Sequence, residues 1–333
     1  MKRTSKKSIL VVMLVTLLVA SLIMTGCQQE ENSSRPITVV LDWIPNTNHT
    51  GLYAALEEGY FEEEGLTVEI IQPTEGGSAD LIAAGQGEFG LSYQEQVTYA
   101  RTAETPLPVK AIAAVIQHNT SGFASPTEKQ IVSPRDFEGK KYGGWNSPME
   151  EAMLKGLMEI SGADFSKLEM VSVGTLDFFT AVTEHVDFTW IYYGWDGIAA
   201  EVKGVSLNFI KLQDVDERLD SYTPVIIANE ELLEEDPELA RSFMKAVSKG
   251  YQLAIEDPDR AVEHLLKHAP EIDREIAIES QRYLAKEYRG DASRWGEMDV
   301  EIWQKYADWM FEKQLIPGEL IAEEAFTNEY LPE

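Results

Sequence analysis

Cysteine and histidine are scarce in this chain, and basic residues are heavily outnumbered by acidic ones. A single cysteine among 333 residues excludes an intramolecular disulfide and any metal site built from several cysteines. The five histidines are scattered and form no metal-ligand spacing. Lys and Arg together number 28 against 57 Asp and Glu, a formal net charge of −29. A surface this acidic repels nucleic acid and anionic lipid, so we exclude DNA and RNA as partners.

Motifs of catalysis are also missing from the sequence. It contains no nucleophile elbow, no HExxH and no CxxC. These absences favour a binding protein over an enzyme. We therefore expect no catalytic residue, no metal and no cofactor.

The first residues differ from the rest of the chain. The basic segment MKRTSKK precedes an apolar run of 17 residues, which ends shortly before Cys27. This order is typical of a secretory signal, and the run is short for a transmembrane helix. A cysteine after a small residue resembles the lipidation site of a bacterial lipoprotein, although Met24 stands where leucine is usual. We expect a signal peptide at 1–26, lipidation at Cys27 and a disordered tether at 27–35. An uncleaved anchor with an incidental cysteine is the alternative.

From Pro36 onward, short apolar runs alternate with helical patterns of about ten residues. Such alternation is typical of βαβ units and a mostly parallel sheet, and it occurs in two successive sets. After about residue 225 the pattern becomes helical. Segment 117–128 is expected to be one link between the two halves, and the stretch around Tyr222 the return. The sequence therefore predicts an α/β fold with two lobes and a helical C-terminal tail.

Unusual side chains stand where four of the expected strands end. Ligands bind beyond the carboxyl ends of strands in open parallel sheets, so we take these positions as the candidate site. The candidate ligand-binding residues are Asp42, Trp43, Asn46, His49, Tyr93, Glu95, Gln117, Trp145, Asn146, Trp190, Tyr192 and Trp195.

Several of these side chains also have plain structural explanations. Trp43 could belong to an ordinary core between the lobes, and His49 could cap or pack against a helix. Neighbouring residues on a strand face opposite ways, so some of the aromatic residues at 190–195 should be core. Glu150, at the start of an expected helix, fits a capping role better than a ligand contact.

The chemistry of the candidate residues suits a flat heteroaromatic ligand. Indole and phenol rings can sandwich such a ring, and carboxylates and amides can pair with its nitrogens and amino groups. The loops that carry the candidate residues contain neither Arg nor Lys, which disfavours an anionic ligand.

Three segments resemble the solute-binding proteins of ABC importers that are related to the thiamine pyrimidine precursor synthase. They are LDWIPNTNHTGLYAALEEGYFEEEGLTVEII at 41–71, GEFGLSY at 87–93 and WQKYADWM at 303–310. The resemblance implies a periplasmic-binding-protein fold of the class with two crossovers, whose ligand lies in the interlobe cleft. It also implies lobe I at 36–120 plus 223–333, and lobe II at 121–222.

The resemblance further implies a ligand and partners. The family ligand is a 4-aminopyrimidine with a formylaminomethyl group, a breakdown product of thiamine. Trp43 with Trp190 or Tyr192 would stack on its ring, Asp42, Asn46 or Glu95 would meet its nitrogens, and Trp145 and Asn146 its side group. The expected partners are an ABC permease and its ATPase subunit. The body should be monomeric, held to the extracytoplasmic face of the cell membrane by its lipid alone.

Two alternatives remain open at this point. The first is the synthase itself, which holds pyridoxal phosphate on a lysine and consumes its own histidine. Ser92 and Gln96 stand at those two positions, and a Schiff base requires an amine. The second alternative keeps the fold and changes the ligand to an alkanesulfonate or another small solute.

Overall fold

The computed structural model describes residues 34–72, 77–174 and 176–333. The chain divides into two compact units, Met1–Arg35 and Pro36–Glu333. The predicted signal peptide and Cys27 lie outside the described residues. So does the predicted tether except for Ser34 and Arg35, and Arg35 already begins the first strand.

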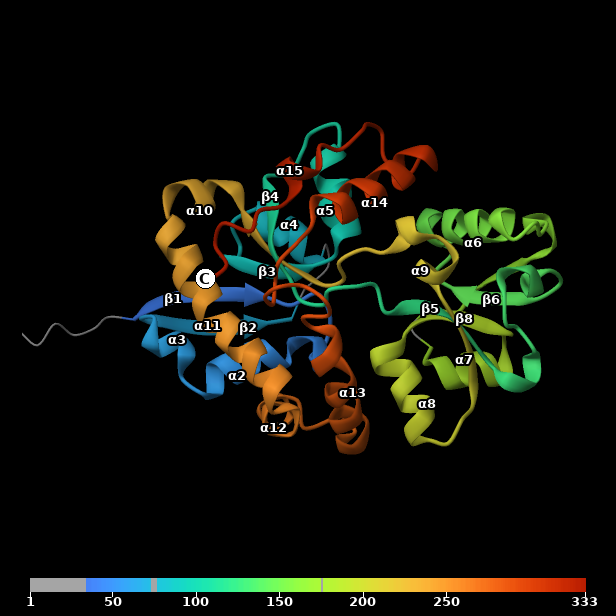
Figure 1. Cartoon of the computed structure of the whole chain (residues 1–333), viewed down its shortest axis with the longest axis horizontal. Coiled ribbons are helices and arrows are strands. Elements are labelled where there is room, and N and C mark those ends of the chain that lie inside the picture. Colours follow the sequence, from blue (N-terminus) through green and yellow to red (C-terminus); the bar gives the residue numbers. More distant parts are fainter. Residues whose placement is uncertain (1–33, 73–76, 175) are drawn as a thin grey trace, which may run out of the picture. The chain divides into compact units, whose positions relative to one another are not determined.

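Two five-stranded mixed sheets organise the second unit (Figure 1). The first has the order β2-β1-β3-β10-β4 and the second the order β7-β6-β8-β5-β9. The strands of the first sheet are β1 (Arg35–Val40), β2 (Leu66–Ile71), β3 (Phe89–Ser92), β4 (Val109–Ala114) and β10 (Val225–Asn229). Those of the second are β5 (Ser121–Pro126), β6 (Lys141–Gly144), β7 (Glu169–Ser172), β8 (Phe188–Tyr192) and β9 (Leu207–Lys211). The expected α/β fold with two lobes is confirmed.

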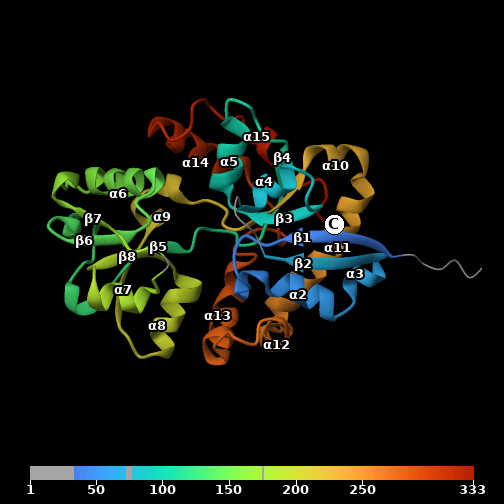
Figure 2. The ribbon, with the colours of Figure 1, turned by 180° about the vertical axis from the view of Figure 1, so that it is seen from behind.

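Helices cover both faces of the first sheet (Figures 1 and 2). They are α2 (Thr50–Glu57), α3 (Tyr60–Glu63), α4 (Gly77–Ala83), α5 (Gln94–Thr102), α10 (Glu230–Glu235), α11 (Pro237–Glu256), α12 (Pro258–His268), α13 (Arg274–Glu287), α14 (Val300–Glu312) and α15 (Ala322–Ala325). One face packs with α2 and α11 around Phe89 and Phe243, whose rings stack 3.8 Å apart. Alternate strand residues such as Val40 and Ile227 face the other way, toward α4, α5 and α14.

The second sheet is covered by shorter helices and turns. They are α6 (Pro148–Ile160), α7 (Phe178–Glu184), α8 (Ile198–Val202) and α9 (Leu212–Val215), with turns η2 (Thr127–Lys129), η3 (Pro134–Phe137), η4 (Phe165–Lys167) and the π-helical η5 (Tyr193–Gly197). Two further turns are η1 (Thr47–His49) and η6 (Glu217–Leu219). Phe123, Phe137 and Phe188 form the aromatic centre of one core of this lobe.

The chain crosses between the sheets twice. Strand β4 belongs to the first sheet and β5 to the second, so residues 115–120 form the first crossover. Residues 212–224 lead back from β9 to β10 and form the second. The proposed lobe boundaries at 120/121 and 222/223 fall within these crossovers or at their ends.

The segment expected as a link at 117–128 contains a strand. Residues 121–126 of this segment are β5, which pairs with β8 on one side and β9 on the other. Gly122 permits the close pairing with β9, because a Cβ there would lie 2.3 Å from the carbonyl oxygen of Ile210. A run rich in Ser, Gly and Pro is typical of a loop, and only its place inside the sheet makes it a strand.

Helix α14 contributes to the cores of both lobes. Trp303, near its start, belongs to the core of the first sheet with Val225 and Ile227. Trp309 and Met310, two turns later, belong to the core of the second sheet. The helical tail is therefore shared between the lobes.

Candidate functional site

The loop after β1 places a buried carboxylate at the edge of the first sheet. The Asp42 side chain is only 3% exposed, and its Oδ1 lies 2.6 Å from Nε2 of the fully buried His49. The backbone N–H of Asn46 donates to the other ring nitrogen, Nδ1, at 3.2 Å. Because Nδ1 accepts this bond, the ring proton is on Nε2, which donates to Asp42.

Side chains of α11 and α13 hydrogen-bond to this loop, and a further bond lies within it. The hydroxyl of Thr47 bonds to that of Ser280 on α13 at 2.6 Å. The hydroxyl of Tyr251 on α11 donates to the Asn48 carbonyl at 2.7 Å. Asn46 caps η1 through its side chain. The carboxylate of Asp42 is thus fixed by groups far away in the sequence.

Asp42 is held in its charged form. Burial acts to raise its pKa, but the His49 imidazole and hydrogen bonds from His49 and Tyr93 outweigh this and lower the pKa. Burial and the charge of Asp42 raise the pKa of Tyr93 far above its usual value, so its hydroxyl stays protonated as a donor. Asp42 and Tyr93 together therefore present a negative charge at the start of the site.

Two adjoining cavities open beside these residues. We name them the Asp42 cavity, of about 660 Å³, and the Glu95 cavity, of about 420 Å³. Both are lined by residues of the two lobes, and they share Tyr93, Trp145, Tyr192 and Thr223. They are therefore parts of one cleft between the lobes.

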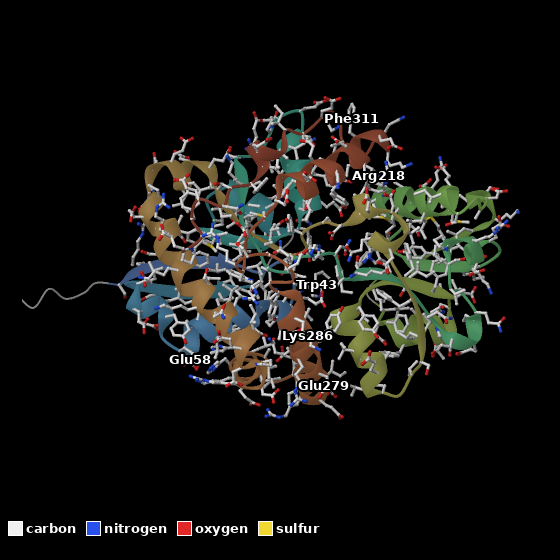
Figure 3. All side chains as sticks on the ribbon, viewed as in Figure 1. Trp43, Glu58, Arg218, Glu279, Lys286 and Phe311 are labelled. Carbon is white, nitrogen blue, oxygen red and sulfur yellow. The ribbon has the colours of Figure 1, made fainter. Side chains whose placement is uncertain are left out.

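Exposed aromatic side chains form much of the cleft wall. Trp43 is 54% exposed, Trp145 60% and Tyr192 43%, unusually high values for rings of this size. In Figure 3 Trp43 lies between the helices that cover the two sheets. Trp190 shares the face of β8 that carries Tyr192, and its buried Nε1 has no hydrogen-bond partner among the described residues. Trp43 is not an interlobe core residue.

Acidic groups line both cavities, whereas no Arg or Lys does so among the described residues. The acids are Asp42, Asp196, Glu271 and Asp273 in the Asp42 cavity, and Glu95 and Glu150 in the Glu95 cavity. Burial and the charge of Asp177 raise the pKa of Asp196 to about 6. The cleft is electronegative and suits a neutral or cationic ligand.

Glu150 and Glu95 differ in their partners. The carboxylate of Glu150 caps α6 and accepts bonds from the Tyr142 hydroxyl at 2.8 Å and from the backbone N–H groups of Trp145 at 3.0 Å and Ser147 at 2.8 Å. This is the capping role expected from the sequence. Glu95, in the first turn of α5, has no hydrogen-bond partner in the described part of the chain. Burial, with the charge of Glu150, raises its pKa to about 7.

Nine of the twelve candidate residues line the cleft, and whether they contact a ligand stays a prediction. They are Asp42, Trp43, Asn46, Tyr93, Glu95, Trp145, Trp190, Tyr192 and Trp195. His49 lies behind Asp42 instead. Gln117 donates from Nε2 to the Glu297 carbonyl at 3.0 Å, and Asn146 is an exposed residue with a φ of 57°. These three residues line neither cavity.

Other lining residues were not expected from the sequence. Tyr306 of α14 reaches the Glu95 cavity, and Asn119, Ser221 and Thr223 line the cleft from the two crossovers. Tyr306 lies three residues from Trp303 and Trp309, a spacing that indicates core packing and nothing more. The crossover residues are short polar side chains without a motif, so no sequence signal marks them.

The comparisons with known proteins identify the family of this chain. Residues 46–261 match the family model described as NMT1/THI5 like. The chain belongs to this family. It is 30% identical over 328 residues to the formylaminopyrimidine-binding protein of Halalkalibacterium halodurans, covering 95% of this chain and 98% of that protein. It is 23% identical over 308 residues to the riboflavin-binding protein RibY of Chloroflexus aurantiacus, covering 89% and 86%.

Solved structures identify the fold of this chain. The periplasmic aliphatic sulphonate binding protein SsuA from Escherichia coli superposes with a TM-score of 0.68 at 13% identity, covering 87% of this chain and 91% of SsuA. The expected periplasmic-binding-protein fold is thereby confirmed. Within the described ranges there is no cluster of three or more potential metal ligands. None of the described helices is long and apolar enough to cross a membrane.

Proposed function

We propose that this protein is the solute-binding component of an ABC importer that captures N-formyl-4-amino-5-aminomethyl-2-methylpyrimidine for thiamine salvage. The observation that carries the proposal is the cleft itself, with exposed rings on its walls and carboxylates but no cation among its lining residues. The relative from Halalkalibacterium halodurans, named for binding formylaminopyrimidine, supports the choice of ligand.

Different lining residues would stack on the pyrimidine ring and bond to its edge. Trp43 from lobe I and Tyr192 or Trp190 from lobe II would hold the two faces of the pyrimidine. Asp42, Asn46 or Glu95 would meet its amino group and ring nitrogens, and Trp145 its side group. His49 would act indirectly, by orienting Asp42. Trp195 and Tyr93 would close the remaining walls.

An alkanesulfonate is a poorer ligand for this cleft despite the fold shared with SsuA. A sulfonate requires arginine, lysine or clustered backbone N–H groups to balance its charge. Six acidic residues line the cavities, and desolvating an anion beside them would cost several kcal/mol. A different neutral heteroaromatic compound is the second candidate, favoured by the combined size of the cavities and by the relative RibY.

Binding without chemistry is also supported by the residues at the synthase positions. Ser92 is buried at the end of β3, and its hydroxyl donates to Oε1 of Gln96 at 3.1 Å. Neither side chain offers an amine or an imidazole, so a Schiff base to pyridoxal phosphate has no attachment point here. We propose that the protein is not an enzyme.

Capture would proceed by closure of the two lobes. The ligand would first bind the aromatic residues of one lobe. Its further contacts with the other lobe would then favour the closed conformation over the open one, with the crossovers acting as the hinge. The closed form would dock on a permease whose ATPase subunit drives import. We propose that a lipid on Cys27 holds a monomeric body at the extracytoplasmic face of the membrane. A Cys27→Ser variant should then be released into the medium.

Calorimetric titration tests the ligand directly. The chain from residue 35 onward would be titrated with formylaminopyrimidine, hydroxymethylpyrimidine, thiamine, riboflavin and taurine. Tight one-to-one binding of an aminopyrimidine with no response to taurine is the expected result. Silence from every pyrimidine would leave the fold intact and overturn the ligand.

A further inference from the structure

The carboxyl group of Glu95 has no hydrogen-bond partner in the described chain, and it shares the Glu95 cavity with one other carboxyl group, that of Glu150. Glu95 lines this cavity, and the charge of Glu150 acts on it without a hydrogen bond between the two side chains. Its side chain is partly buried and lines the cavity, so a ligand there can supply the hydrogen bonds that the chain does not. The following inference rests on the function proposed above.

Glu150, in the same cavity, shows what a satisfied carboxylate looks like here. Its two oxygens receive bonds from one hydroxyl and two backbone N–H groups. Glu95 receives none and lies close enough to feel the charge of Glu150. Of the two carboxyl groups in this cavity, Glu95 is therefore the one left free to bond to a ligand.

The other titratable groups around Glu95 are all tyrosines. Tyr93 precedes it at the cap of α5, Tyr99 lies one turn later, Tyr192 faces it from β8 and Tyr306 from α14. Burial is the main cause that raises the pKa of each, to about 12 for Tyr99 and Tyr192. All four stay neutral at pH 7 to 9. None can supply a positive charge to hold Glu95 ionised.

A protonated carboxyl group and a 4-aminopyrimidine have complementary edges. The acid presents an O–H donor beside a carbonyl acceptor, and the pyrimidine presents a ring-nitrogen acceptor beside an amino donor. An ionised carboxylate is only an acceptor, so it would repel the lone pair of the ring nitrogen. We propose that Glu95 recognises the pyrimidine edge as the neutral acid through two hydrogen bonds, and that binding at alkaline pH takes up one proton from solvent.

The dependence on pH follows from the proton count. With a pKa of about 7, Glu95 is largely ionised in the free protein at pH 9 and must regain its proton to form the pair. Affinity falls with the fraction of competent protein, which predicts a loss of roughly 10-fold to 100-fold between pH 7 and pH 9.

Titration calorimetry in two buffers of different ionisation enthalpy, such as tricine and Tris at pH 8.5, counts the protons. The wild type with formylaminopyrimidine should take up close to one proton per ligand. The amide of Glu95→Gln offers a donor beside an acceptor at every pH. This variant should therefore take up close to no protons on binding, and its affinity should fall less than about threefold between pH 7 and pH 9. His118→Gln is the matched control, because His118 also titrates in this range but lies outside the cleft lining; it should keep the uptake.

The possible results test the role of Glu95 separately from the proposed ligand. Absence of aminopyrimidine binding at every pH would overturn both. Binding by the wild type without proton uptake, or an uptake that persists in Glu95→Gln, would overturn the role of Glu95 and leave the ligand standing. Absence of uptake in the wild type would overturn the role of Glu95 even if Glu95→Gln failed to fold.

Discussion

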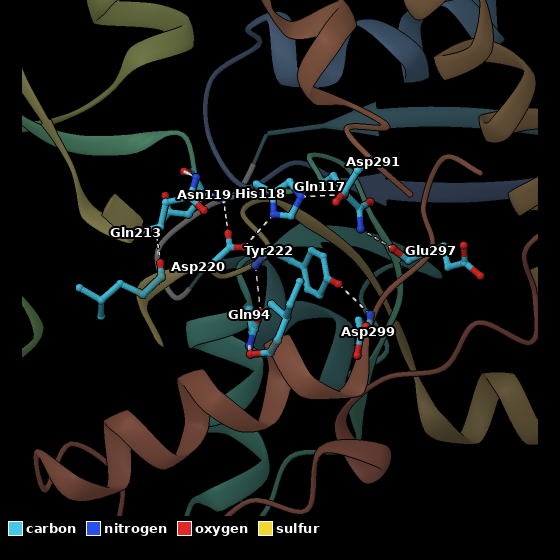
Figure 4. Close-up of polar contacts among 12 residues, drawn as sticks. Gln94, Gln117, His118, Asn119, Gln213, Asp220, Tyr222, Asp291, Glu297 and Asp299 are labelled. Atoms are coloured by element: carbon cyan, nitrogen blue, oxygen red, sulfur yellow. Dashed lines mark hydrogen bonds and ion pairs between the residues drawn. The ribbon is translucent and has the colours of Figure 1, made fainter. Parts of the chain in front are cut away.

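His118 and Asp220 join the two crossovers, with Nδ1 of the imidazole 2.7 Å from Oδ2 of the carboxylate (Figure 4). The other oxygen of Asp220 accepts the backbone N–H of Asn119 at 2.9 Å. The second ring nitrogen of His118 lies 2.9 Å from Asp291, in the loop that follows α13. One imidazole thus connects both crossovers to the tail of the first lobe.

This connection should make stability depend on pH. Asp220, with Asp291, raises the pKa of His118 from 6.5 to about 9. Because the pKa of His118 is raised in the folded state, its contribution to the free energy of unfolding is complete below pH 6.5 and is lost as the pH rises toward 9. Because Asp291 is largely exposed, we expect about 1–2 kcal/mol. Urea unfolding at pH 6 and pH 9.5 should show this loss in the wild type and a smaller one in His118→Gln. Equal losses in the two proteins would contradict the assignment.

Asp42 should depend on His49 for its orientation. His49→Leu removes the donor to Asp42 and leaves a buried charge with one bond fewer, so ligand affinity should fall about 10-fold to 100-fold. His49→Gln places an amide donor near the same point and should recover part of the loss. Calorimetry measures both variants, with a thermal melt as the check on folding. Leucine and glutamine variants with equal affinity would argue against an orienting role.

Trp43 should matter for binding and hardly at all for stability. More than half of its surface is exposed, so Trp43→Ala removes little buried area. Loss of a stacking face should weaken aminopyrimidine binding by about 1–3 kcal/mol, or roughly 5-fold to 150-fold. Ile321→Ala is the control, since Ile321 is 59% exposed and lines neither cavity. Unchanged affinity in Trp43→Ala would remove this residue from the proposed site.

Trp309 should stabilise both lobes at once. It is 1% exposed in the core of the second sheet, although α14 begins in the core of the first. Trp309→Ala should cost about 3–5 kcal/mol in a single unfolding transition. Phe311 lies on the same helix and is 39% exposed, so Phe311→Ala should cost less than about 1 kcal/mol. Two separate transitions in the wild type would show that the lobes unfold independently.

The residues at strand ends were predictable because local chemistry marks them. Asp42-Trp43, Tyr93 and Trp145 each stand within three residues of the carboxyl end of a strand, where ligands bind in open parallel sheets. The family and the fold were accessible from the same segments. Gln117 and Asn146 show the limit of this reasoning, since position in the sequence does not reveal which way a side chain points.

Other parts depend on contacts that sequence does not display. Strand β5 is built from residues that favour loops, and it becomes a strand because β8 and β9 pair with it on both sides. Tyr306 reaches the cleft because α14 passes from one lobe to the other, a route fixed by distant packing. The missing partner of Glu95 likewise emerges only when its surroundings are known.

A helix shared by two cores also limits how the chain can be recombined. The lobe II that we propose at 121–222 looks like an exchangeable insert, since the two crossovers connect it to the first sheet. Its core nevertheless includes Trp309, Met310 and Ile316, supplied from the other end of the sequence. A chimera that takes lobe II from a relative must therefore take residues 306–316 from the same parent. Any ancestral exchange of ligand specificity by swapping lobes would have faced the same requirement.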